Sequence, residues 1–215
     1  MEFRDVRTGV LSGYEIDMAN ELFKRANLKF EYRAIDWGKK DDELLKDKTI
    51  DVIWASMTIT DERKALYGVS VPYIKNEQIA VVNPDSPIRS KDDLGGKKVV
   101  SYKGSIALDL LKQFKNSNGV GVQVEEYADL PEALSAVVAG KADAAVADSV
   151  SVNYYVERSP GKFRVLDQNF NEEEFGVAVR PNETALLEKI NKELTAMQAD
   201  GTSQAIYKRW FGEDK

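Results

Sequence analysis

Two successive blocks of strand-like and helix-like segments constrain the fold of this chain more than any other feature. In the first block, apolar spacing predicts a helix over residues 16–26, an alternating strand over 28–34 and a buried apolar strand over 50–55. A stretch containing Pro72, Pro84 and Pro87 then indicates a change of domain. The second block contains predicted strands at 98–102, 122–126, 142–147, 163–166 and 175–179, and helices at 106–114, 131–139, 150–156, 183–199 and 203–210.

Alternating strands and helices favour parallel sheets that are covered by helices on both faces. We therefore predict an α/β fold with two doubly wound lobes. Folds of this kind place their binding groups at the carboxyl ends of the strands. The segments that follow Ala55, Tyr102 and Ala147 are accordingly the first places to look for a site.

Composition excludes several classes of function. The 215 residues include no cysteine and no histidine, which removes disulfides, thiol nucleophiles and imidazole bases, so that any metal site would consist of oxygen ligands alone. The net charge of −6 argues against nucleic acid as a partner. No apolar run approaches the roughly 20 residues that cross a bilayer. The first residues lack the basic-then-apolar order of a signal peptide, so we expect none within this sequence. We expect no cofactor, no metal and no catalytic residues.

Several segments resemble, in order, the sequence blocks of one protein family. One of these segments, Ala55–Arg63, is similar to the family block AGMTITxxR, and this match is highly specific. The other matching segments are Gly13–Ala19, Ser70–Tyr73, Asp92–Lys97, Lys103–Ser105, Asp129–Leu134, Ala142–Asp148 and Trp210–Gly212. Together they resemble the extracellular solute-binding proteins of polar amino-acid ABC transporters, which have the type II periplasmic-binding-protein fold.

The resemblance implies two lobes joined by a two-strand hinge. Lobe 1 would be discontinuous, with residues 1–72 and 180–215, and lobe 2 would comprise residues 78–173. The hinge would consist of residues 73–77 and 174–179. The family resemblance also implies that the chain binds a free amino acid between the lobes. It implies further that the chain delivers this amino acid, outside the cytoplasm, to a membrane permease. A dehydratase of the prephenate or arogenate type and the sensory domain of a receptor remain as alternative functions of this fold.

In the first lobe, the resemblance assigns the ligand carboxylate to Arg63, because arginine offers a bidentate fork. Thr58 and the backbone near Ser56 would assist, and Trp37 would lie against the ligand side chain. Arg63 could instead be a surface arginine in the first turn of a helix, and Trp37 could be a core residue. Trp54 is expected to pack rather than to touch ligand.

In the second lobe, the resemblance assigns the ligand ammonium to Asp148, which ends an apolar strand. Asp148 could equally cap the helix that begins at Ser149. Ser105 and Ile106 would present amides at a helix N-terminus, although Gly104 could mark only a strand-to-helix turn. Tyr102 is expected to pack.

The chain departs from the family pattern at its start and at Ser56, where glycine is usual. In the family, a strand precedes the segment that matches Met1–Phe3, and it lies between the strands expected here at 28–34 and 50–55. We expect the resulting gap to close by a shift of strands, by residues 3–6 folding inward, or by a strand from another chain. Weakened amino-acid binding and some self-association would follow.

Overall fold

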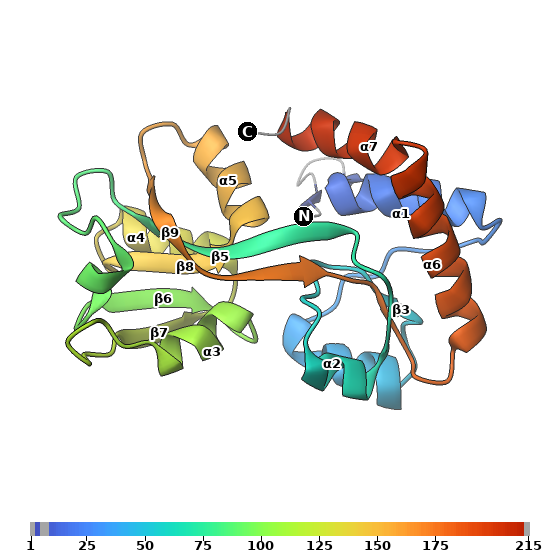
Figure 1. Ribbon diagram of the computed structural model, residues 1–215, viewed down its shortest axis with the longest axis horizontal. Coiled ribbons are helices and arrows are strands. Elements are labelled where there is room, and N and C mark those ends of the chain that lie inside the picture. Colours follow the sequence, from blue (N-terminus) through green and yellow to red (C-terminus); the bar gives the residue numbers. More distant parts are fainter. Residues whose placement is uncertain (1–2, 5–8, 213–215) are drawn as a thin grey trace. The chain divides into compact units, whose positions relative to one another are not determined.

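The structure is a computed structural model that describes residues 3–4 and 9–212 of the chain. The chain forms two compact units, shown in Figure 1. Unit 1 comprises Met1–Lys75 and Glu174–Lys215, and unit 2 comprises Asn76–Glu173. The chain therefore passes between the units twice, once within each of two long strands. These are β5 (Ile74–Val82) and β9 (Arg164–Phe175).

Unit 2 is built on a five-stranded sheet with the order β7-β6-β8-β5-β9. Its other strands are β6 (Lys98–Tyr102), β7 (Gln123–Tyr127) and β8 (Ala144–Asp148). Strand β6 runs parallel to β7 and β8, whereas β5 runs antiparallel to β8. The α/β prediction is confirmed, but the sheet is mixed rather than parallel, because β5 enters it directly from unit 1 instead of through a helical crossover and pairs antiparallel with β8.

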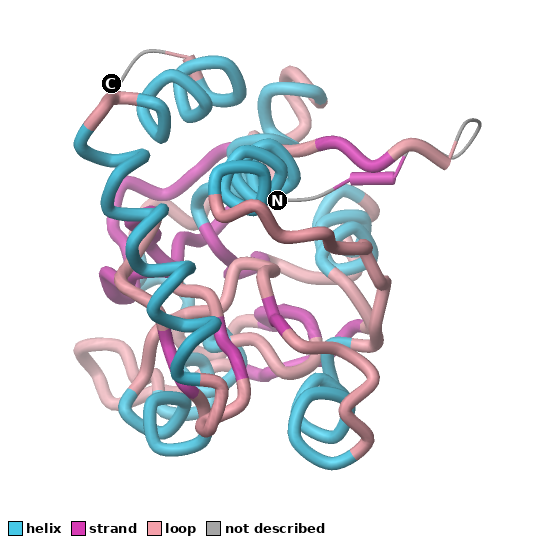
Figure 2. The backbone as a smooth tube through the Cα atoms, turned by 90° about the vertical axis from the view of Figure 1, so that its right-hand side faces the viewer, coloured by secondary structure: helices cyan, strands magenta, loops and turns pink. Residues whose placement is uncertain are grey.

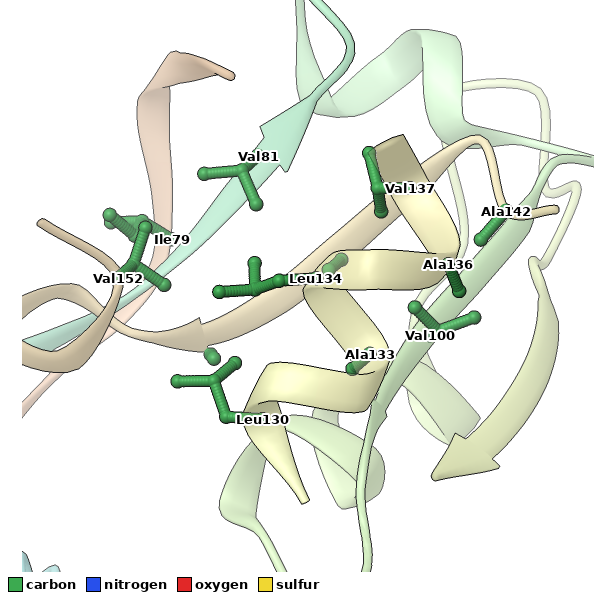
Figure 3. Packing of buried hydrophobic residues seen from close by; sticks show 12 residues of the cluster. Ile79, Val81, Val100, Leu130, Ala133, Leu134, Ala136, Val137, Ala142 and Val152 are labelled. Atoms are coloured by element: carbon green, nitrogen blue, oxygen red, sulfur yellow. The ribbon is translucent and has the colours of Figure 1, made fainter. Parts of the chain in front are cut away.

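Helices cover both faces of this sheet, so alternate residues of its central strands are buried on opposite sides. On one face, Val81 and Val100 pack against α4 (Leu130–Val138), as Figure 3 shows. On the other face, Val99 packs in a second cluster with Leu111 of α3 (Ile106–Gln113). Unit 2 also contains η3 (Lys91–Leu94) and α5 (Ser149–Arg158).

The helices of unit 2 begin where the sequence predicts a start. The Asp129 side chain accepts a hydrogen bond from the Glu132 amide and caps α4, which has Pro131 in its first turn. Ser105 caps α3 in the same way by accepting from the Leu108 amide at 3.3 Å. These local signals fix the starts of the helices that follow β6 and β7.

Unit 1 combines short strands with longer helices, which Figure 2 separates by colour. Its sheet has the order β3-β10-β4, with both pairs antiparallel, and β1 pairs with β2. These strands are β1 (Phe3–Arg4), β2 (Leu11–Ser12), β3 (Val52–Ile53), β4 (Gly68–Val69) and β10 (Ala178–Val179). The helices are α1 (Tyr14–Arg25), η1 (Trp37–Lys39), η2 (Asp42–Lys46), α2 (Asp61–Leu66), α6 (Thr184–Ala199) and α7 (Thr202–Phe211).

The strand predicted over residues 28–34 does not form, and the one predicted over 50–55 shortens to β3. Alternating apolar and polar residues favour a strand. The segment forms one only where a neighbouring strand can pair with its backbone. No described strand lies beside residues 28–34. Phe3–Arg4 pairs with Leu11–Ser12 instead of folding toward β3; the rest of the inward-folding route, residues 5 and 6, lies outside the described residues.

Two further strands differ from the prediction in extent. The strand predicted at 163–166 continues to Phe175 as β9, and the strand predicted at 175–179 shortens to β10 at Ala178–Val179. Strand β5 was not predicted, because the prolines around it suggested a linker.

Within the residues that the structure describes, no helix is long and apolar enough to cross a membrane.

Candidate functional site

The loop after β3 carries Ser56 and Thr58, two of the site residues predicted in unit 1. Ser56 has φ 48°, a left-handed conformation that residues other than glycine seldom adopt. Its amide donates to Glu15 Oε1 at 2.7 Å, and its hydroxyl lies 3.3 Å from the same oxygen. Glu15 is buried on α1 and also accepts a hydrogen bond from the Tyr73 hydroxyl. A buried carboxylate therefore holds the loop in its uncommon conformation.

Arg63 is fixed by three contacts within unit 1. Its amide donates to Thr60 Oγ1 at 3.2 Å, which places it in the first turn of α2. Its Nη1 donates to the Thr58 carbonyl at 2.8 Å, and its guanidinium carbon lies 5.8 Å from the centre of the Trp37 ring. The side chain is thus folded back over its own loop and is half-buried. This placement orients a planar cation beside an aromatic face.

Thr58 and Ser56 lie in a loop that is tied to the segment following β9. The Ile59 amide donates to the Glu174 carbonyl at 2.8 Å, and the Gly176 amide donates to the Met57 carbonyl at 2.9 Å. A Cβ at Gly176 would lie 2.9 Å from Ile59 Cδ1, so only glycine allows this close approach without a shift.

Trp54 packs between aromatic rings of unit 1, as the sequence predicts, with the Phe23 ring centre at 6.2 Å and that of Tyr73 at 5.5 Å.

In unit 2, Asp148 is 5% exposed at the end of β8 and accepts three hydrogen bonds from neutral donors. Gln78 Nε2 and Asn76 Nδ2 donate to Oδ1 at 2.7 and 2.9 Å, and the Tyr102 hydroxyl donates to Oδ2 at 2.8 Å. Asp148 occupies the N-cap position of α5, but its side chain makes no capping hydrogen bond. The capping interpretation of the aspartate is therefore wrong, and Tyr102 does more than pack.

Burial raises the pKa of the Asp148 carboxyl, and the hydrogen bonds from Tyr102, Gln78 and Asn76 oppose that rise. A second carboxylate shares two of these donors, because Glu173 Oε1 accepts from Asn76 Nδ2 at 2.6 Å and also from Gln78 Nε2. Gln78 is 1% exposed, and its Oε1 has no hydrogen-bond partner among the described residues. The cluster is rich in acceptors, which suits a ligand that brings N–H donors.

Ser105 and Ile106 stand at the start of α3, next to this cluster. The Ser105 amide donates to the Tyr102 carbonyl at 3.2 Å, and its hydroxyl lies 3.0 Å from that of Ser101. Gly104 has φ 71° and makes the tight turn between strand and helix. Tyr102 thus joins Ser105 to Asp148 within unit 2.

Sequence reasoning did not identify Glu15, Asn76, Gln78 and Glu173. A signal existed for two of them, because Asn76 and Gln78 alternate along one face of β5, in a region where the hinge was expected to meet lobe 2 and no strand was predicted. Glu173 has no such signal, and Glu15 lies within the matching block Gly13–Ala19, where nothing distinguished it from its neighbours. No group of side chains in the part of the chain that the structure describes is suited to hold a metal ion.

Comparison with known proteins identifies the family. The family of bacterial extracellular solute-binding proteins, family 3, matches residues 1–213. The L-cystine-binding protein TcyJ of Escherichia coli K12 is 34% identical over 210 residues, covering 96% of this chain and 76% of that protein. The glutamine-binding protein GlnH of Bacillus subtilis is 31% identical over 211 residues, covering 96% and 75%.

Solved structures agree with these relatives. An ancestral arginine-binding protein bound to arginine superposes with a TM-score of 0.88 at 36% identity, covering 98% of this chain and 92% of that one. A substrate-binding protein from Streptococcus pneumoniae with bound histidine superposes with a TM-score of 0.91 at 32% identity, covering 100% and 88%. The chain belongs to the bacterial extracellular solute-binding proteins, family 3.

Proposed function

We propose that this protein binds a free α-amino acid and delivers it to the permease of an ABC transporter outside the cytoplasmic membrane. The carboxylate would be held by Arg63, with Ser56 and Thr58, and the ammonium by Asp148. Trp37 would contact the ligand side chain, and the start of α3 at Ser105 and Ile106 would add amide donors. The relatives are named for cystine, glutamine, arginine or histidine binding, and these ligands share their α-carboxylate and α-ammonium groups.

The observation that carries this proposal is the Asp148 cluster. A buried carboxylate is costly unless it is hydrogen-bonded or paired with a cation. Three neutral donors orient the Asp148 carboxylate without neutralising it. A ligand ammonium would supply the positive charge, and it could also donate to the buried oxygen of Gln78. The family and the named relatives are binding proteins rather than enzymes, which argues against the dehydratase alternative.

A thermal-shift screen with the twenty amino acids tests the proposal. A ligand at about 100 times its dissociation constant adds about 2.7 kcal/mol of apparent stability. For a chain of this length that corresponds to a rise in melting temperature of roughly 5–10 °C. Prephenate and the α-keto acid of any stabilising amino acid serve as controls, because they lack the ammonium group. A protein that no amino acid stabilises, or that the keto acid stabilises equally, would contradict the proposal.

A further inference from the structure

Two carboxamide side chains on one face of β5 donate to the same two carboxylates. Asn76 and Gln78 are two residues apart in this strand, so their side chains lie on the same face. Their NH2 groups donate to Asp148 Oδ1 at 2.9 and 2.7 Å, and both also donate to Glu173 Oε1. All four residues belong to unit 2. The two amides therefore bridge the two carboxylates in the same way.

The oxygens of these two amides differ in what they accept. Asn76 Oδ1 accepts a hydrogen bond from the Ser149 hydroxyl at 3.2 Å. Gln78 Oε1 is buried and has no donor among the described residues. Turning the Gln78 amide over does not help, because its oxygen would then face two carboxylate oxygens. A buried acceptor without a donor costs about 1–3 kcal/mol. Gln78 Oε1 is therefore an acceptor that remains for a bound molecule.

Gln78 Oε1 lies within reach of a group that is bound to Asp148. In a carboxamide the oxygen is about 2.2 Å from the nitrogen. Because Gln78 Nε2 is 2.7 Å from Asp148 Oδ1, Gln78 Oε1 is at most about 5 Å from that carboxylate oxygen. Two N–H groups of one tetrahedral ammonium reach acceptors that are about 4.6 Å apart. The geometry thus permits one ammonium to donate to both oxygens.

We propose that Gln78 is a ligand-binding residue, and that Gln78 Oε1 and Asp148 together select amino acids with at least two N–H groups on the α-nitrogen. An N,N-dialkylated amino acid has one N–H group when it is protonated, and a betaine has none. Such a ligand leaves a buried acceptor unpaired, and sites that hydrogen-bond an N–H group discriminate strongly against the analogue that lacks it.

Asn76 has a different role from Gln78 in this proposal. Its oxygen is already paired with Ser149, so it orients the Asp148 carboxylate and does not contact the ligand. Asn76 is thus a positioning residue. The inference rests on the proposed function, because it requires Asp148 to bind the ligand ammonium.

The test compares two ligands by calorimetry on the full chain. One is the amino acid that gives the largest rise in melting temperature in the screen of twenty. The other is its Nα,Nα-dimethyl derivative, which keeps the positive charge but has a single N–H group. We expect the wild type to bind the derivative at least tenfold more weakly than the parent. In Gln78→Met this ratio of dissociation constants should fall at least fivefold, because the acceptor is gone.

Asn76→Leu is the matched control. It removes the same kind of donation to Asp148 and Glu173 but leaves Gln78 Oε1 in place. We expect both variants to bind the parent more weakly and only Gln78→Met to change the ratio. An unchanged ratio in Gln78→Met, or the same change in both variants, would overturn the inference and leave the proposed function standing. A wild type that binds none of the twenty amino acids would overturn both.

A measurement on the wild type applies even if a variant does not fold. With 13C at the side-chain carbonyl of glutamine, the Gln78 signal in a nuclear magnetic resonance spectrum should move when the parent amino acid binds, because its oxygen gains a hydrogen bond. A Gln78 signal that stays in place at saturation would overturn the inference without any substitution.

Discussion

Arg63 is the residue whose role depends most on the geometry of its own loop. The Thr58 carbonyl and the Trp37 ring hold its guanidinium group in one place. We predict that Arg63→Ala lowers amino-acid binding by on the order of 2–5 kcal/mol, because a charged contact is lost. Arg63→Lys should recover little, since an ammonium cannot reproduce the planar fork. Calorimetry measures both, with Arg89→Ala, at an exposed arginine, as the control. Near-normal affinity in Arg63→Ala would remove this residue from the site.

We expect the buried Asp148 carboxylate to lower the stability of the ligand-free protein. Burial raises its pKa, so the folded state binds the carboxyl proton more tightly than the unfolded chain does. The stability contributed by this proton is present below the unfolded pKa, near 3.9, and is lost as the pH rises through the folded pKa. We predict that Asp148→Asn makes the ligand-free protein at least as stable as the wild type at pH 7, since the amide can still accept from Gln78 and donate to Tyr102.

Urea unfolding at a series of pH values measures this effect, and calorimetry measures the loss of ligand binding. The stability difference should shrink as the pH falls through the raised pKa of the wild-type carboxyl, because the folded protein takes up this proton above the ordinary aspartate pKa of about 3.9. Asp85→Asn, at an exposed aspartate, is the control. A variant that is less stable than the wild type at every pH would show that the carboxylate charge stabilises the fold.

Glu15, on α1, supports the loop after β3, and its removal tests that support. Glu15→Ala leaves the Ser56 amide and the Tyr73 hydroxyl without the acceptor that the carboxylate provides. We predict a loss of about 2–3 kcal/mol in the free energy of unfolding, because buried donors would go unsatisfied. Denaturant titration checks this, with the exposed Glu188→Ala as the control. A change as small as that of the control would show that the loop does not need Glu15.

At the scale of elements, the contact between the loop after β3 and the segment after β9 depends on Gly176. Gly176→Ala would bring a Cβ within 2.9 Å of Ile59 Cδ1. We predict destabilisation by about 1–3 kcal/mol, the usual cost of overpacking. The same substitution in an Ile59→Ala background should cost much less, because the opposing side chain is gone. A double-mutant cycle measures the coupling. Additive effects would mean that this contact relaxes without strain.

At the scale of the whole molecule, the proposed ligand groups belong to different units. Arg63 lies in unit 1 and Asp148 in unit 2. A ligand changes the balance between two conformations only if it binds them with different affinity. We predict that the stabilising amino acid lowers the radius of gyration of the wild type in small-angle scattering, and that Asp148→Asn abolishes this change. Equal compaction in both proteins would exclude Asp148 from domain closure.

The sequence by itself determined most elements of unit 2, because their signals are local. Apolar spacing and the turn at Gly104 place β6 and α3, and Asp129 and Pro131 place the start of α4. The segments that resemble the family blocks also indicated Arg63 and Asp148 as candidate ligand-binding residues, from their residue types and their positions within those segments. Whether these two residues bind ligand stays a prediction until the substitutions are measured.

Only the tertiary structure decided which residues surround them. Asn76, Gln78 and Glu173 converge on Asp148 or on each other across 70 or more residues of sequence, and Glu15 reaches Ser56 across 41. Local periodicity carries no information about such contacts. The same reason explains residues 28–34, whose alternation is typical of a strand. A strand forms only where a neighbour accepts its hydrogen bonds, and that neighbour is a property of the folded chain rather than of the segment.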